Sequence, residues 1–114
     1  MRKLSLILIL TCFSLLSTAC AGRQVALGER FTLAEDETVK VKGEPLLIRL
    51  VYIGRDFTEE GEYAFAEVEI KYEGEWTTIS PYVGDEWKIG EYVIYMQGAN
   101  PFGDTSCDLV VEKP

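Results

Sequence analysis

The chain has 114 residues, with 19 acidic and 11 basic side chains and a formal net charge of −8 at neutral pH. This length predicts one domain with a modest core, and the acidic balance argues against nucleic acid as a partner, because an acidic surface repels phosphates. The sequence contains no histidine, which removes the commonest general base and the commonest metal ligand from any catalytic mechanism.

The chain begins with a short cationic segment and an apolar run. Arg2 and Lys3 precede residues 4–16, which carry no charge and are interrupted only by small polar side chains and one cysteine. A membrane span needs about 20 apolar residues, so this shorter run is typical of an export signal. We therefore expect residues 1–19 to be a signal peptide.

The run ends in Leu16-Ser17-Thr18-Ala19-Cys20, which resembles the lipobox of bacterial lipoproteins. The resemblance implies that a diacylglyceryl group is attached to the thiol of Cys20 and that a signal peptidase cuts between Ala19 and Cys20. The membrane is then a partner through this lipid. A second cut remains open, because Ala19-Cys20-Ala21 also fits the A-x-A site of ordinary signal peptidase, which would release a soluble, secreted domain.

The lipoprotein resemblance also implies a location and a division of the chain. Residues 20–27 would form the lipidated start and a short tether, and residues 28–114 the folded domain. The domain would be extracytoplasmic and anchored to the cell membrane or, in a source with two membranes, to the periplasmic face of the outer one. Ala21 favours the outer membrane, since an aspartate after the cysteine resembles the inner-membrane retention signal of enteric bacteria.

Cysteine use predicts a domain without an internal disulfide. Cys12 leaves with the signal peptide and Cys20 takes the lipid, so only Cys107 remains in the mature domain. Cys107 is in phase with Leu109 and Val111, which favours a buried, small apolar side chain. The alternative is a reactive thiol, for which no histidine or lysine stands nearby in sequence to lower the pKa.

Short β-type segments fill the rest of the chain, and no helical periodicity of useful length appears. We expect strands at residues 31–33, 38–42, 46–53, 64–72, 76–82, 92–97 and 107–112. The fourth of these alternates most strictly, with one face expected to be buried (Ala64, Ala66, Val68, Ile70) and the other exposed (Glu67, Glu69, Lys71). Tyr72-Glu73-Gly74-Glu75-Trp76 predicts a hairpin turn.

About seven strands with no helix to cover a sheet predict an all-β fold in which two sheets bury their faces on each other. We therefore expect an immunoglobulin-like, antiparallel β-sandwich, with a small barrel as the alternative. The opening Gly28-Glu29-Arg30-Phe31-Thr32-Leu33 and the closing strand also look like the small β-sandwich domains of uncharacterised bacterial lipoproteins. This second resemblance implies no active-site motif.

Acidic side chains are the remaining candidates for chemistry. Glu67 and Glu69 lie about 7 Å apart on one strand face, a separation that glycosidases use, but an exposed face of alternating charge is the ordinary interpretation. Residues 35–37 and 56–62 cluster oxygen ligands without the spacing of a calcium loop. We expect no catalytic residue, no metal site and no cofactor.

One loop stands out as a candidate binding site. Residues 97–106 join the last two strands, and Asn100, Phe102 and Asp104 are its candidate contact residues, since binding residues often lie on loops held by a rigid scaffold. Burial of a phenylalanine is worth about 2 kcal/mol, so we expect Phe102 to fold back on the core, with an exposed contact residue as the alternative. Trp76, Trp87 and Tyr82 suggest a carbohydrate platform, for which ordinary packing is the competing interpretation.

These observations lead to several hypotheses about function. The first is a non-enzymatic lipoprotein whose domain binds an unidentified envelope protein or glycan. The second is an envelope protease inhibitor that presents residues 97–106, and the third is an envelope hydrolase. Rigid loops that protrude at one end of the sandwich would favour the inhibitor, whereas carboxylates that converge in a cleft would favour the hydrolase.

Overall fold

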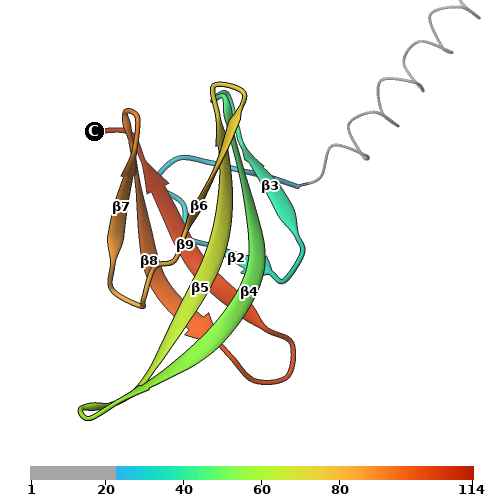
Figure 1. The fold of residues 1–114 in the computed structure, drawn as a ribbon. Coiled ribbons are helices and arrows are strands. Elements are labelled where there is room, and N and C mark those ends of the chain that lie inside the picture. Colours follow the sequence, from blue (N-terminus) through green and yellow to red (C-terminus); the bar gives the residue numbers. More distant parts are fainter. Residues whose placement is uncertain (1–22) are drawn as a thin grey trace, which may run out of the picture.

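The computed structural model describes residues 23–114, so the predicted signal peptide and lipid site, Ala19 and Cys20 included, lie outside the described residues. The described part is all β and contains no helix (Figure 1). Its nine strands are β1 (Arg23–Val25), β2 (Phe31–Ala34), β3 (Thr38–Val41), β4 (Leu46–Thr58), β5 (Gly61–Tyr72), β6 (Glu75–Ile79), β7 (Glu86–Ile89), β8 (Tyr92–Asn100) and β9 (Ser106–Glu112).

Two sheets pack face to face and form a β-sandwich. One sheet has the order β1-β3-β4-β5-β6, here called sheet A, and the other has the order β2-β9-β8-β7, here called sheet B. All neighbouring strands are antiparallel except β1, which runs parallel to β3. The predicted all-β sandwich is confirmed, with nine strands in place of about seven because β1 and β7 add a short edge to each sheet.

Each sheet consists mainly of consecutive hairpins. Strands β3 to β6 follow one another across sheet A, and β7 to β9 follow one another across sheet B, with β2 beside β9. Immunoglobulin domains instead interleave strands that are distant in sequence within each sheet. The likeness to an immunoglobulin domain is therefore one of two-layer architecture, while the order of the strands differs.

The core lies between the sheets and follows from the period-2 alternation of the strands. Ala66, Val68 and Ile70 are completely buried, as the sequence predicts. Ala64 is only half-buried, because this end of β5 extends past the core. The opposite face points outward, and Glu67, Glu69 and Lys71 are half-buried there by their neighbours instead of fully exposed.

The hairpin turn between β5 and β6 is also where the sequence predicts it. Tyr72 pairs with Glu75 across the turn, and Glu73 and Gly74 both adopt positive φ angles, of 52° and 82°. Two consecutive positive φ angles are the requirement of a tight turn that matches the twist of the flanking strands.

The N-terminal boundary of the folded domain differs from the prediction. Residues 23–25, expected in the tether, form β1 along the edge of β3, and the Lys42 N–H donates to the Val25 carbonyl at 2.8 Å. Val25 belongs to the core, and Leu27 packs against it. Regular structure therefore begins at Arg23, before the expected start of the folded domain at residue 28, and a three-residue strand is too short to show an alternating pattern.

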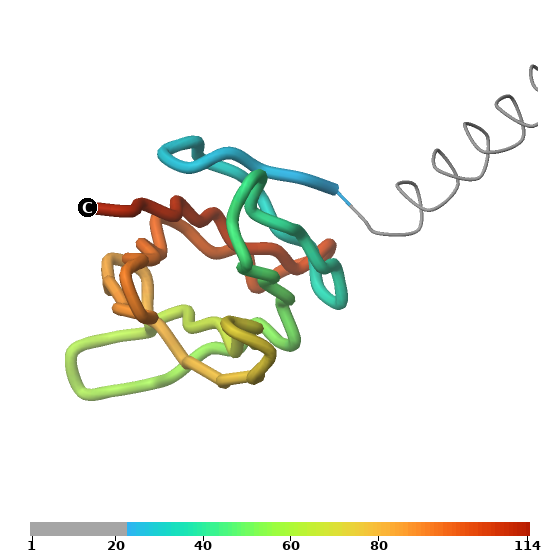
Figure 2. The backbone as a smooth tube through the Cα atoms, turned by 90° about the horizontal axis from the view of Figure 1, so that it is seen from above, coloured from blue at the N-terminus to red at the C-terminus, as the bar shows by residue number. Residues whose placement is uncertain are grey.

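The longest hairpin reaches beyond the sandwich. Strands β4 and β5 stay paired from Leu46 and Tyr72 at one end to Thr58 and Gly61 at the other. Their distal part, residues 54–65, is here called the arm; it projects from one end of the molecule, on the side away from the start of β1 (Figures 1 and 2). The sequence predicts only the proximal parts of both strands, since Gly54 and the acidic residues that follow it are typical of a loop.

Candidate functional site

An aromatic row supports the outer face of the arm at its base. The Phe65 ring lies 6.1 Å from the Tyr52 ring and 6.0 Å from the Tyr82 ring, measured between centroids. Gly54 makes this packing possible, because a Cβ at that position would come within 2.5 Å of the Phe65 ring and 2.7 Å of the Tyr52 ring. The aromatic side chains thus replace, on one face of the arm, the packing that a second sheet provides elsewhere.

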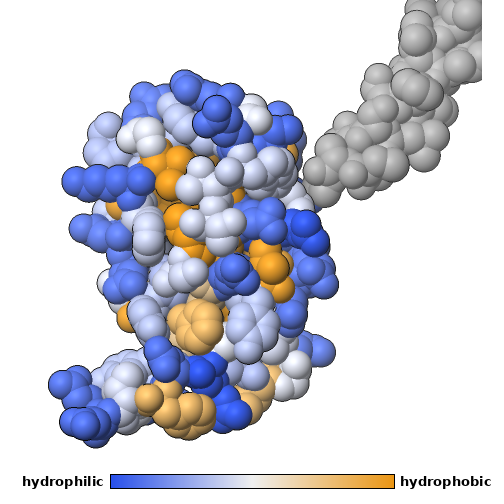
Figure 3. All heavy atoms as spheres, in the orientation of Figure 1, coloured by the Kyte–Doolittle hydropathy of each residue, from blue (hydrophilic) through white to orange (hydrophobic). Residues whose placement is uncertain are grey.

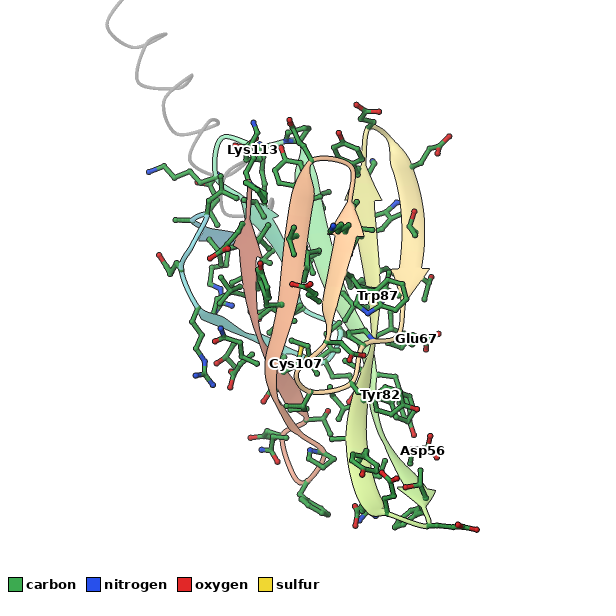
Figure 4. The ribbon with its side chains drawn as sticks, turned by 90° about the vertical axis from the view of Figure 1, so that its left-hand side faces the viewer. Asp56, Glu67, Tyr82, Trp87, Cys107 and Lys113 are labelled. Atoms are coloured by element: carbon green, nitrogen blue, oxygen red, sulfur yellow. The ribbon has the colours of Figure 1, made fainter. Side chains whose placement is uncertain are left out.

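Residues that follow β6 fasten this base to the rest of the domain. The Tyr82 hydroxyl donates to the Asp56 carboxylate at 2.8 Å, and the Ala66 N–H donates to the Pro81 carbonyl at 3.0 Å. The hydrogen bond to Asp56 and the charge of that carboxylate raise the pKa of Tyr82, so the phenol stays protonated and keeps donating. Figure 4 shows Asp56 and Tyr82 together beside the arm, with Cys107 inside the sandwich and Lys113 at the opposite end.

The other face of the arm meets the loop between β8 and β9. The Arg55 guanidinium carbon lies 5.7 Å from the centroid of the Phe57 ring and 4.9 Å from that of Phe102, and the guanidinium is paired with Glu62 at 3.1 Å. Phe57 is 70% exposed and Phe102 is 61% exposed. We call Arg55, Phe57 and Phe102 the aromatic end.

The loop that carries Phe102 is shorter than the sequence predicts, and hydrogen bonds hold both of its ends. Strand β8 continues to Asn100 and β9 begins at Ser106, so the connection is residues 101–105 instead of 97–106. The Asn100 side-chain oxygen accepts from the Phe102 N–H at 3.2 Å. At the other end, the Thr105 hydroxyl donates to the Glu35 carboxylate, and the Glu35 N–H donates to the Thr105 carbonyl at 3.2 Å.

The expected inward position of Phe102 is wrong, and the alternative, an exposed aromatic residue on the loop, is the observed one. Asn100 turns the chain outward, Gly103 has a positive φ of 61°, and the Phe102 ring packs on Arg55 of the arm instead of on the core. Of the three predicted contact residues, Asn100 shapes the loop, Phe102 is presented to solvent, and Asp104 is exposed beside it.

Acidic residues are frequent on the two segments that form the aromatic end. Apolar side chains stand among hydrophilic ones at the arm end of the molecule (Figure 3). Phe57 and Phe102 are exposed large apolar residues of the arm and the loop. The nearby acidic residues of the arm and the loop are Asp56, Glu59, Glu60, Glu62 and Asp104. An aromatic and arginine centre with a charged rim is the composition of many protein-binding hot spots.

The other candidate residues do not assemble into a reactive site. Glu69 lies opposite Arg49 on β4 and Glu67 lies opposite Tyr52, both on the outer face of sheet A. The two candidate calcium loops use their carboxylates in other contacts: Asp36 with Arg49, Glu37 with Arg23 and the Ala34 N–H, Asp56 with Tyr82, and Glu62 with Arg55. Within residues 23–114, no three His, Cys, Asp or Glu side chains come together as a group that could hold a metal ion.

The three aromatic residues suggested as a carbohydrate platform lie on separate parts of the domain. Trp76 is on β6 opposite Lys71, Trp87 is on β7 of the other sheet, and Tyr82 lies beside Phe65. Phe65 and Lys71 are six residues apart along β5, which corresponds to about 20 Å. The three side chains therefore do not form one continuous surface.

Cys107 matches its prediction. The side chain is 1% exposed and belongs to the core between the sheets. Burial, with a smaller contribution from the charge of Asp108, raises the pKa of the thiol to about 12. The thiol is therefore protonated at neutral pH and lacks the thiolate character of a reactive cysteine.

Comparison of the chain with protein-family models, curated proteins and solved structures finds no match. In residues 23–114 there is no helix with the length and apolar character needed to cross a membrane. The function is therefore inferred from the arrangement of side chains described above, with the sequence pattern of the first twenty residues as the second line of argument.

Proposed function

We propose that this protein is a membrane-anchored, extracytoplasmic lipoprotein whose β-sandwich binds a partner in the cell envelope without catalysing a reaction. The observation that carries the binding role is the aromatic end, in which Arg55 holds two exposed phenylalanine rings on two different segments. Two exposed rings 4.9 and 5.7 Å from one guanidinium form a compact contact surface where the arm meets the 101–105 loop.

The aromatic end is organised before any partner arrives. Binding normally costs free energy for the ordering of loops and long side chains. Here the 101–105 loop is pinned at both ends by the contacts of Asn100 and Glu35, and the base of the arm is fixed by the Tyr82–Asp56 hydrogen bond. Binding of a partner would therefore require little further ordering of these segments. This supports a role in binding and argues against a role as a flexible connection only.

A non-enzymatic role is supported by the state of the side chains that perform chemistry in other proteins. The chain has no histidine, and the thiol of Cys107 is buried and protonated. Glu67 and Glu69 face outward from a sheet surface and do not converge across a cleft. These features leave binding as the activity that the exposed residues suit best.

The position of the arm is consistent with anchoring through Cys20. The described chain starts at Arg23, three residues after the proposed lipid site, and the arm points away from that start (Figures 1 and 2). An anchor at the start of the chain would leave the aromatic end free to reach a partner in the envelope.

Site-specific photo-crosslinking in the native host tests the binding role. A photoreactive phenylalanine analogue at position 102 should give one defined adduct, and a Phe57→Ser variant should reduce the yield of that adduct at least about tenfold, as expected for loss of a hot-spot aromatic. The analogue at Lys88, an exposed position on sheet B, serves as the control. Equal adduct patterns at both positions would contradict the proposal.

Metabolic labelling with a fatty acid tests the anchor. The wild-type protein should take up the label and fractionate with membranes, whereas Cys20→Ser should do neither. An unlabelled wild-type protein that is soluble after export would instead establish the A-x-A cut and the secreted form.

A second candidate function is a loop-presenting envelope protease inhibitor of sandwich fold. The observation that favours it is the exposed Phe102 on a loop pinned at both ends, since an inhibitor loop must resist cleavage by staying rigid. Purified protein should then inhibit an envelope protease that prefers aromatic side chains, and Phe102→Asp should abolish the inhibition. If the loop is cut at the rate of an unfolded peptide, this function is excluded.

A further inference from the structure

A row of five side chains crosses the whole outer face of sheet A at the end opposite the arm. The pairing registers place Gln24 beside Lys40, Lys40 beside Leu47, Leu47 beside Lys71, and Lys71 beside Trp76, on β1, β3, β4, β5 and β6 in turn. We call these five residues the basic row. Their neighbours along the strands, such as Leu46 and Ile70, are buried in the core, so the row faces solvent.

The basic row departs from the acidic character of the chain. Lys40 and Lys71 flank the apolar Leu47, and the Lys71 ammonium lies 5.9 Å from the Trp76 ring, which is 48% exposed. An exposed tryptophan beside lysines on a protein of net charge −8 is a combination typical of a membrane interface, where the indole ring sits at the headgroup level.

A shallow hollow of about 250 Å³ lies on this face. It is lined by Lys40, Glu44, Pro45, Leu46, Leu47, Lys71 and Gly74. Its one carboxylate is already engaged, because Glu44 accepts a hydrogen bond from the Tyr92 hydroxyl at 2.6 Å and is paired with Lys113 at 3.5 Å. Lys40 is exposed and Lys71 is half-buried at this hollow, so the two ammonium groups can act as donors for an anion over a partly apolar floor.

The short segment between Cys20 and β1 indicates that the basic row would contact the membrane. Gln24 is four positions after Cys20, so the two Cα atoms can be at most about 14 Å apart. A lipid on Cys20 would hold the first residue of the basic row within that distance of the bilayer. The arm carries four carboxylates (Asp56, Glu59, Glu60 and Glu62), against two, Glu73 and Glu75, in the hairpin turn beside Trp76. An anionic surface would therefore repel the arm more strongly, so the domain would tilt with the arm outward.

We propose that the basic row docks on anionic phospholipid headgroups, with Lys40 and Lys71 contacting phosphate and Trp76 entering the interface. This inference rests on the lipid anchor of the proposed function. It adds an orientation: sheet A lies on the membrane at its basic row, and the aromatic end is presented away from it. Each lysine near an anionic surface strengthens the contact about fivefold, so the pair contributes about 25-fold.

The test uses the full-length mature lipoprotein, purified from its host and reconstituted into vesicles of phosphatidylcholine alone or mixed with phosphatidylglycerol. The chain has two tryptophans, so Trp87→Phe isolates the fluorescence of Trp76, and Trp76→Phe isolates that of Trp87 as the matched control. Brominated lipids should quench Trp76 in the anionic vesicles and leave Trp87 unaffected. High salt should remove the difference between the vesicles, because it screens the headgroup charges.

Substitutions identify the residues responsible. Lys40→Gln with Lys71→Gln should bring the quenching of Trp76 down to its value in phosphatidylcholine, whereas Lys88→Gln, at an exposed position on sheet B, should leave it unchanged. Quenching that is equal in both vesicle types, or equal for the two tryptophans, overturns the proposal. A dimer in detergent that the lysine pair variant abolishes would also overturn it, since the face would then bind a second copy.

The same experiment separates failure of the docking from failure of the anchor. Flotation with phosphatidylcholine vesicles reports the lipid on Cys20 independently of headgroup charge. A protein that floats but shows no charge-dependent quenching refutes the docking and retains the anchor, whereas a protein that does not float refutes the anchor.

Discussion

The two halves of the β4–β5 hairpin show how one pair of strands can be stabilised in two different ways. In the proximal half, Ile48 and Ile70 are completely buried between the sheets, and charged residues face solvent. In the arm, both faces are accessible, and aromatic rings pack on a glycine on one side and on Arg55 on the other. Backbone pairing continues through both halves, with a shift in register between Leu50 and Tyr52, while the source of side-chain packing changes.

This difference predicts two levels of stability in one hairpin. Burial between the sheets couples the proximal half to the unfolding of the whole domain. The arm depends on a few contacts among partly exposed side chains, and such regions open locally at lower free energy. The binding surface formed by the arm and the 101–105 loop is thus supported by a rigid base and remains separable from the core.

The largest effect should come from a charge placed in the proximal half. Val68→Asp buries an unpaired carboxylate at a completely buried position and should cost about 4 kcal/mol or more, enough to unfold a domain of this size. Circular dichroism should show the loss of the cooperative β-sheet transition. Thr78→Lys, which adds a charge at an exposed site opposite Glu69 on the neighbouring strand, is the control and should destabilise the domain by less than about 0.5 kcal/mol.

The proximal half is also the part that the sequence predicts best. Ala66, Val68 and Ile70 alternate with charged residues, and that pattern has one physical explanation, a strand with one buried face. The hairpin turn at Gly74 is equally local, since the residue type itself permits the positive φ angle. Buried Cys107 follows from the same alternation on β9.

The arm and the aromatic end were harder to predict because their contacts are non-local. In the sequence, Gly54 is typical of a turn. Its position inside β4 is explained only by the Phe65 ring of the paired strand, which occupies the space that a Cβ at position 54 would need. From the sequence, Phe102 is expected in the core. In the structure its ring instead packs on the guanidinium of Arg55, which is 47 positions earlier in the chain. The one sequence signal for this packing is the presence of aromatic residues on both sides of Gly54. Aromatic side chains commonly pack over glycine in β-sheets.

The second effect in size concerns thiol chemistry in the two halves. Cys107 should react with alkylating reagents only as fast as the domain unfolds, because the thiol is buried and its pKa is raised to about 12. A Tyr63→Cys variant places a thiol on the arm, where the native side chain is 41% exposed. Its alkylation should be at least about a thousandfold faster than that of Cys107. Rapid labelling of Cys107 in the native protein would show that the sandwich opens like the arm.

The third effect should be confined to the arm. Gly54→Ala places a Cβ 2.5 Å from the Phe65 ring, so the ring must move, at a cost of about 1–3 kcal/mol. Hydrogen exchange should accelerate at the amides of residues 54–65 and change little at Ile48 and Ile70. The control is a double-mutant cycle with Phe65→Ala, in which the cost of the added methyl group should largely vanish. An undiminished cost would mean that the backbone, and not the ring, limits this position.

The smallest effect separates two surface ion pairs with similar geometry. Arg30 is paired with Asp108 at 2.9 Å and joins the start of β2 to β9, whereas Arg55 is paired with Glu62 at 3.1 Å within the arm. Asp108→Asn should lower the free energy of unfolding by about 1 kcal/mol, and Glu62→Gln should leave the global transition unchanged. Thermal melts of the two variants at neutral pH make the comparison directly.

The pH dependence of Asp108 sharpens the same contrast. A hydrogen bond from the Thr32 hydroxyl, at 2.6 Å, and then one from Arg30 hold the pKa of Asp108 below its ordinary value of about 3.9. The native state therefore binds this proton less readily than the unfolded chain does, so the contribution is complete above pH of about 4 and is lost as the pH falls through the lower native pKa. Wild type and Asp108→Asn should differ in melting temperature at neutral pH and converge in acid. A difference that persists unchanged in acid would mean that the asparagine disturbs the packing of β2 on β9, and that the charge of Asp108 contributes nothing.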